Sequence, residues 1–161
     1  MNLHALCSTV STQMHAGVLH YLFAGVVSRQ SVQAVLATGW WTRTARSARA
    51  IVLRMRGVDL VGADESERSV RASGQEFRRA LAGLANLPVA AVVAPEHLQL
   101  FRWYAMALAD EGVIYRAFTD EGRAHRWALE QAALLQQQEQ YWQAQQSAAP
   151  ARTPAAALLG H

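Results

Sequence analysis

Segments with the hydrophobic pattern of a strand alternate with segments that have the pattern of a helix, from residue 18 to residue 135. The first strand-like segment, residues 18–24, is rich in branched and aromatic side chains. A helix is predicted after it, because Val32, Val35 and Leu36 have the spacing of one helical face. Strands that alternate with helices favour a mostly parallel sheet whose strands are joined by crossover helices.

Two later segments predict strands with different surroundings. In residues 49–56, apolar side chains alternate with Arg54 and Arg56, so we expect a strand with one solvated side or a strand at the sheet edge. Residues 89–94 form an uninterrupted apolar run, which is typical of a strand covered on both faces. A fourth strand is predicted over residues 113–118.

Capping residues mark where the later helices begin. Ser73 and Glu76 have the spacing of a capping box, which predicts a helix start at this point. Pro95 suits the first turn of the next helix. The last helix is predicted to begin near residues 119–121 and to continue to residues 141–142.

The chain of 161 residues is long enough for one domain with its own hydrophobic core. We expect an N-terminal arm over residues 1–14, a single α/β domain over residues 15–146 that ends in a long Gln-rich helix, and a disordered Ala/Pro-rich tail over residues 147–161. Residues 1–28 contain no Lys or Arg, so no secretory signal is predicted. A soluble, cytoplasmic protein without a membrane span is therefore expected.

The order of residues becomes specific between Pro88 and Trp127. A strand that leads into Pro95-Glu96 is followed by a helix with Arg102 and Tyr104-Ala105, by Gly112, by a strand that ends Phe118-Thr119-Asp120, and by a helix with Ala124 and Trp127. This order resembles that of the small SpoIIAA-like (STAS-like) bacterial proteins, in outline over residues 15–130. The resemblance implies a mixed, mostly parallel sheet of four to five strands with helices mainly on one side, a fold shared with the lipid-carrying CRAL-TRIO domains.

The same resemblance implies a non-catalytic regulatory or protein-interaction domain of the bacterial cytoplasm. STAS-group antagonists of anti-sigma factors carry an Asp-Ser-Ser-Gly type motif whose serine is phosphorylated. Residues 58–67 match that region but lack the motif, and Ser66 is the candidate phosphosite there. Because Glu65 and Glu67 flank Ser66, their charges would repel a phosphate group. Partner switching controlled by phosphorylation is therefore disfavoured.

Two parts of the chain are candidate interaction surfaces. Adjacent Trp residues cannot both face inward from one helix, and exposed Trp is typical of partner interfaces. The first candidate surface combines such a pair with basic and acidic neighbours: Trp40, Trp41, Arg43, Arg46, Asp64 and Glu65. The second is the Gln-rich end of the last helix, which has enough apolar area to dock on the domain or on a second chain, through Leu134, Leu135, Tyr141 and Trp142. The partner protein is unknown, and a homodimer is one alternative.

Two alternative functions stay open beside an interaction domain. Several aromatic side chains are candidates to line an apolar pocket for a lipid-like ligand, which requires a closed cavity of about 300 Å³ or more. They are Trp40, Trp41, Trp103, Tyr104 and Trp127. The third alternative is an enzyme, which requires that distant acids and histidines converge in one cleft.

No catalytic, cofactor-binding or metal-binding residues are predicted. The sequence contains neither a nucleophile elbow nor a glycine-rich phosphate loop. His15 and His20 are five residues apart and are predicted to point to opposite faces of a strand, so joint metal binding is not expected. All fifteen basic residues are Arg and the net charge is +3, but no RNA-binding motif accompanies them, so nucleic acid is not expected as a partner.

Overall fold

The computed structural model describes residues 9–39, 46–80 and 86–148, and its centre is a five-stranded sheet. The strand order is β1-β2-β4-β6-β7, in which β1 is antiparallel to β2 and all other neighbours are parallel. The strands are β1 (Thr9–His15), β2 (Val18–Ala24), β4 (Ala50–Arg54), β6 (Val89–Val92) and β7 (Tyr115–Phe118). A separate parallel pair joins β3 (Val26–Val27) to β5 (Asp59–Leu60). The predicted mixed, mostly parallel sheet is confirmed.

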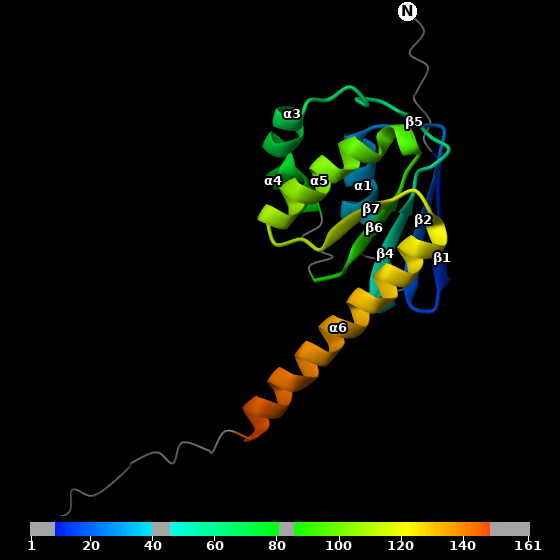
Figure 1. The fold of residues 1–161 in the computed structure, drawn as a ribbon. Helices are drawn as coiled ribbons and strands as arrows, with labels where there is room; N and C mark the ends of the chain where they lie inside the picture. Colours follow the sequence, from blue (N-terminus) through cyan, green and yellow to red (C-terminus); the bar gives the residue numbers. More distant parts are fainter. Residues whose placement is uncertain (1–8, 40–45, 81–85, 149–161) are drawn as a thin grey trace, which may run out of the picture.

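Helices cover both faces of this sheet, but unequally (Figure 1). One face packs against α1 (Arg29–Gly39), α3 (Glu67–Ala72), α4 (Gly74–Ala80) and α5 (Leu98–Asp110), with the short 3-10 helix η2 (Pro95–His97) leading into α5. The other face packs against a single helix, α6 (Glu121–Ala148). The prediction that helices lie mainly on one side is therefore confirmed.

Alternate residues of the strands supply the two cores, as the period-two geometry of a strand requires. Leu19 and Ile51 belong to the larger core, on the side of α1 and α5. Val18 and Val52 belong to the smaller core, where they meet Ala128 of α6. The small side chains of α6 allow this helix to lie close to the sheet.

The prediction that residues 49–56 form an edge strand, or a strand with one solvated side, is wrong. β4 lies between β2 and β6, and Ile51, Val52 and Leu53 are completely buried. The prediction rested on two arginines, but Arg54 is the last residue of β4 and Arg56 lies beyond it. Both therefore mark the end of the strand rather than a solvated face. Within the strand, the second face is apolar and is covered by α6.

The predicted arm over residues 1–14 also differs from the structure, since residues 9–14 belong to β1. Every residue of β1 is exposed, and the strand pairs with β2 in a hairpin that places Gln13 opposite His20. The turn uses Ala16 and Gly17, both with positive φ. An edge strand is held by backbone hydrogen bonds to one neighbour, so it needs no apolar face that a sequence pattern would reveal. The rest of the predicted arm, residues 1–8, lies outside the described residues. Of the predicted tail, residues 147–148 belong to α6, and residues 149–161 lie outside the described residues.

The helix start predicted at Ser73 and Glu76 is present, since α4 begins at Gly74, but the hydroxyl of Ser73 is used differently from a capping box. Ser66 is the N-cap of α3, and its side chain accepts a hydrogen bond from the backbone N–H of Ser69. Ser73 instead terminates α3, and its hydroxyl donates back to the carbonyl oxygen of Ser69. The additional finding is α3, a short helix that ends at Ser73, directly before the predicted start of α4.

Candidate functional site

Helix α6 is the longest element of the described chain, with 28 residues and a length of about 42 Å. Its first half packs on the sheet through Ala124, Ala128 and Ala132. Beyond that contact the helix leaves the sheet and extends away from the rest of the domain (Figure 1). Every residue from 136 to 148 is exposed. The alternative in which the Gln-rich end docks on its own domain therefore does not describe this structure.

Apolar side chains continue along the free part of α6, and we call Leu134, Leu135, Tyr141 and Trp142 the α6 seam. Trp142 follows Ala124 by five turns of about 3.6 residues, so it lies on the side of the helix that is buried further up. The exposed fraction is 51% for Leu134 and 62% for both Tyr141 and Trp142. The two aromatic rings contact each other edge to face, with centroids 6.2 Å apart. The stripe that buries α6 on the sheet thus continues past the sheet to Trp142, which is exposed in the described chain.

A groove lies beside the α6 seam, where the helix leaves the sheet. One wall is formed by α6, including Leu135 and Trp142, and the other by residues that precede β4 and β6. The second wall contains Ala48, Arg49, Asn86 and Leu87. The groove has a volume of about 880 Å³ and is open to solvent, so it is wide enough to take large side chains of another protein segment.

Three histidines meet at the other end of α6. The Nε2 atom of His20 lies 3.0 Å from Nδ1 of His125, and the ring of His15 lies 5.0 Å from that of His125, centre to centre. The predicted opposite orientation of His15 and His20 is wrong, because the two residues lie on different strands of a hairpin and face the same side. Arg54 and Glu121 form an ion pair of 2.8 Å beside them, and the group surrounds an open hollow of about 390 Å³.

The histidine cluster is arranged as a hydrogen-bonded pair rather than as a ligand set. Among the described residues, no group of three or more His, Cys, Asp or Glu side chains is placed to hold a metal ion. Burial of His20 lowers its pKa, and the nearby charges of His125 and Arg54 lower it further. Burial also lowers the pKa of His125. A hydrogen bond between two imidazoles needs one N–H and one lone pair, so it is lost when both rings are protonated.

These shifts predict that the protein loses stability in mild acid. A histidine whose pKa is lower in the folded chain binds protons more readily when unfolded, so the free energy of unfolding should fall as pH drops below about 6.5. The fall should continue until the pH passes the lower, folded pKa. Urea unfolding at several pH values measures this slope.

A matched pair of variants assigns the slope to the cluster. His20→Gln should flatten the pH dependence, while His97→Gln, at the end of η2 and outside the cluster, should leave it as in the wild type. An unchanged slope in His20→Gln would show that the cluster does not set the acid response.

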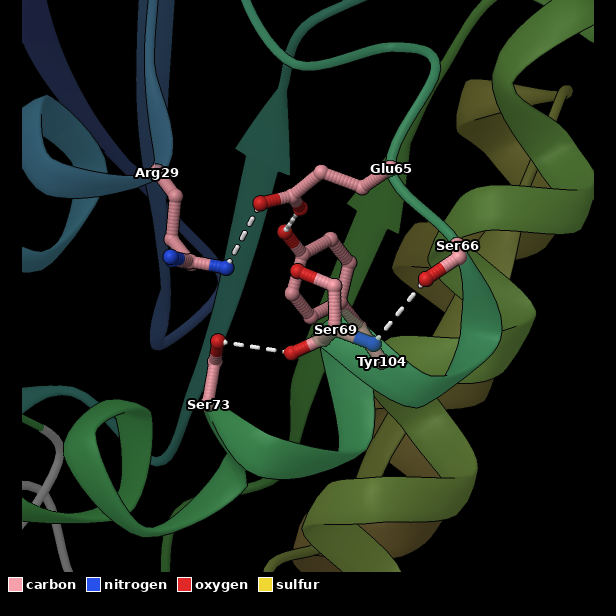
Figure 2. Close-up of polar contacts among 6 residues, drawn as sticks. All are labelled: Arg29, Glu65, Ser66, Ser69, Ser73 and Tyr104. Carbon is pink, nitrogen blue, oxygen red and sulfur yellow. Dashed lines mark hydrogen bonds and ion pairs between the residues drawn. The ribbon is translucent and has the colours of Figure 1, made fainter.

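A second polar group joins three segments on the opposite face of the sheet (Figure 2). The carboxylate of Glu65 accepts a hydrogen bond from Nη1 of Arg29 at 2.8 Å and another from the hydroxyl of Tyr104 at 2.5 Å. Both charged side chains are about four-fifths buried, and burial of Tyr104 raises its pKa, with the hydrogen bond to Glu65 adding to the rise. Tyr104 therefore stays a neutral donor, and Glu65 fastens the loop before α3 to α1 and α5.

The cavity beside this group is too small for a lipid. It lies among apolar residues that include Val32, Phe77 and Phe101, with Arg29 and Tyr104 at its wall, and it holds about 30 Å³. That volume suits roughly two water molecules, whereas a pocket for a drug-sized ligand needs about 300 Å³ or more. The proposed aromatic lining is also divided, because Trp127 packs against Phe118 on the α6 side of the sheet.

The structure does not bring the first predicted interaction surface together. Trp40, Trp41 and Arg43 lie outside the described residues. Arg46 and Asp64 are exposed, and no ion pair joins Arg46 to the acidic loop in the described part of the chain. Glu65 is engaged with Arg29, and the candidate phosphosite Ser66 is an exposed helix cap. The role of Arg29 was not predicted, because this residue directly follows Ser28 and belongs to no recognisable sequence motif.

These elements define the protein as a mixed α/β domain built on a five-stranded sheet, with a long helix α6 whose second half is exposed. No family model matches the chain, and no curated protein matches it. A solved structure that is similar is the crystal structure of an uncharacterised protein of the DUF3478 family with a SpoIIAA-like fold, from Shewanella loihica PV-4. The two share 11% identity with a TM-score of 0.45, over 80% of this chain and 98% of that one. The description of that neighbour names the SpoIIAA-like fold. No helix in the described residues is long and apolar enough to span a membrane.

Proposed function

We propose that the protein is a non-catalytic protein-interaction domain and that its binding surface is the α6 seam with the adjacent groove. The observation that carries the proposal is the exposure of Tyr141 and Trp142, at 62% each, on a helix half in which every residue from 136 to 148 is exposed in the described chain. The regulatory role in a bacterial cytoplasm that the family resemblance implies belongs to the same proposal.

The energetics of an exposed helix support this function. A free helical segment of about 13 residues is marginal in water, because helices this short depend on packing for most of their stability. Tyr and Trp bury large areas and are enriched among the residues that dominate binding energy. A partner that covers the α6 seam would therefore stabilise the helix and bury both aromatic rings.

The chemistry of the surface also describes the partner. Between residues 131 and 148 the chain carries one charge, that of Glu139, and seven of the residues from 136 to 146 are Gln. Recognition by charge is therefore weak, and apolar contact must supply most of the affinity. The matching partner is an amphipathic helix with an uncharged, apolar face that lies along α6 and fills the groove.

Site-specific photo-crosslinking tests this function. A photoreactive phenylalanine analogue is placed at Tyr141 in one variant and at Gln140 in another, and both full-length chains are irradiated in living cells. Gln140 is also exposed on the same helix half, but it lies about 160° around the helix from Trp142, on the side away from the α6 seam. We expect a discrete adduct from position 141 and none from position 140, and Leu135→Ser should remove that adduct.

A further inference from the structure

We propose that the partner of the α6 seam is a second copy of this chain, whose α6 lies antiparallel to the first. This inference rests on the proposed function, since it names the occupant of that same surface. The two-fold axis would pass near Gln138 and Glu139, and each copy would place the end of its helix in the groove of the other.

The spacing of the α6 seam suits this two-fold arrangement. Leu135 and Trp142 lie one heptad apart on one side of the helix, with Gln138 and Glu139 at the midpoint between them. In an antiparallel pair centred on that midpoint, Leu135 of each copy lies opposite Trp142 of the other. A large ring therefore meets a smaller side chain at both ends, and the same patch serves both copies, as a two-fold interface requires.

The charges of the surface permit a second copy. A helix with one charge over residues 131–148 can lie beside an identical helix without a series of like charges in contact. The groove is lined by both Arg49 and Glu139 of its own chain, which carry opposite charges. The one like-charge contact of the arrangement is between the two Glu139 side chains next to the axis, and the rest of the helix surface is uncharged.

The size of the surface predicts a weak dimer. A buried Tyr or Trp contributes about 150 to 250 Å² of surface, and the pair would contain four such rings and two grooves. The rings supply at most about 1,000 Å², so contacts in the two grooves must supply the rest of the roughly 1,200 Å² at the low end of stable interfaces. We expect a dissociation constant on the order of 10 to 100 μM.

Sedimentation equilibrium of the full chain over roughly 1 to 500 μM tests the dimer. We expect a monomer–dimer equilibrium, at least about tenfold weaker in Trp142→Ser and unchanged in Ala144→Ser. Circular dichroism checks that each variant is folded. A folded protein that stays monomeric over the whole range overturns the inference. A crosslink from position 141 to a different protein would then leave the proposed function standing, and the absence of any crosslink would remove both.

Disulfide formation tests the antiparallel arrangement. With Cys7 replaced by Ser, Gln138→Cys should form an intermolecular disulfide on mild oxidation because it lies next to the axis, and Gln145→Cys, one heptad further along the same face, should not. Disulfides from both variants indicate parallel helices and overturn the arrangement. A monomer whose α6 seam is protected from hydrogen exchange indicates that residues 149–161 cover it, which also contradicts a second copy.

Discussion

Replacement of Ala128 by Leu is expected to lower the free energy of unfolding by about 1 to 3 kcal/mol. Ala128 is completely buried between α6 and the sheet, in the core that contains Val18 and Val52. A larger side chain there must either push α6 away or adopt a strained rotamer. Urea unfolding followed by circular dichroism measures the change.

The control lies on the same helix. Ala133→Leu adds the same side chain at an exposed position, so it should change the free energy of unfolding by less than about 0.5 kcal/mol. If Ala128→Leu is as stable as Ala133→Leu, then α6 is not packed on the sheet as described. The account of a helix that is half anchored and half free would then be wrong.

Replacement of Glu65 by Ala is expected to lower the free energy of unfolding by about 2 kcal/mol. The change leaves Arg29 and the hydroxyl of Tyr104 without the acceptor that both use, in a site about four-fifths buried. Removing one partner of a fully buried ion pair costs roughly 3 to 5 kcal/mol, and partial exposure of this pair reduces that figure. Thermal and urea unfolding both measure the loss.

The neighbouring acid provides the comparison for this prediction. Asp64→Asn changes the charge of an exposed residue one position earlier, and it should leave the free energy of unfolding nearly unchanged. The stability of Glu65→Gln should lie between those of Glu65→Ala and Asp64→Asn, because the amide oxygen of Gln can still accept one hydrogen bond. Equal stability of Glu65→Ala and Asp64→Asn would show that the contacts of Glu65 do not hold the loop.

The parts of the fold that follow from local pattern were predictable. The apolar run over residues 89–94 predicts a strand covered on both faces, and β6, at Val89–Val92, is such a strand. The α6 seam was visible for the same reason, since its apolar residues fall at heptad spacing in a long helix. In both cases the signal lies within one element, where the period of the backbone sets the pattern.

The parts that depend on contacts across the chain were not predictable. His20 and His125 are 105 residues apart, and only the packing of α6 over β2 brings them together. The link between Arg29 and Glu65 likewise joins elements 36 residues apart. The polar strand β1 carried no apolar alternation, so its pairing with β2 left no local signal. Side-chain partners of this kind are set by topology, which periodicity does not specify.

The crosslinking comparison at Tyr141 and Gln140 tests the central claim most directly, because it asks which side of the free helix another protein touches. We expect a discrete adduct from position 141, none from position 140, and loss of the adduct in Leu135→Ser. Equal crosslinking from both positions, or none from either in a correctly folded protein, would contradict the claim that the α6 seam is a binding surface.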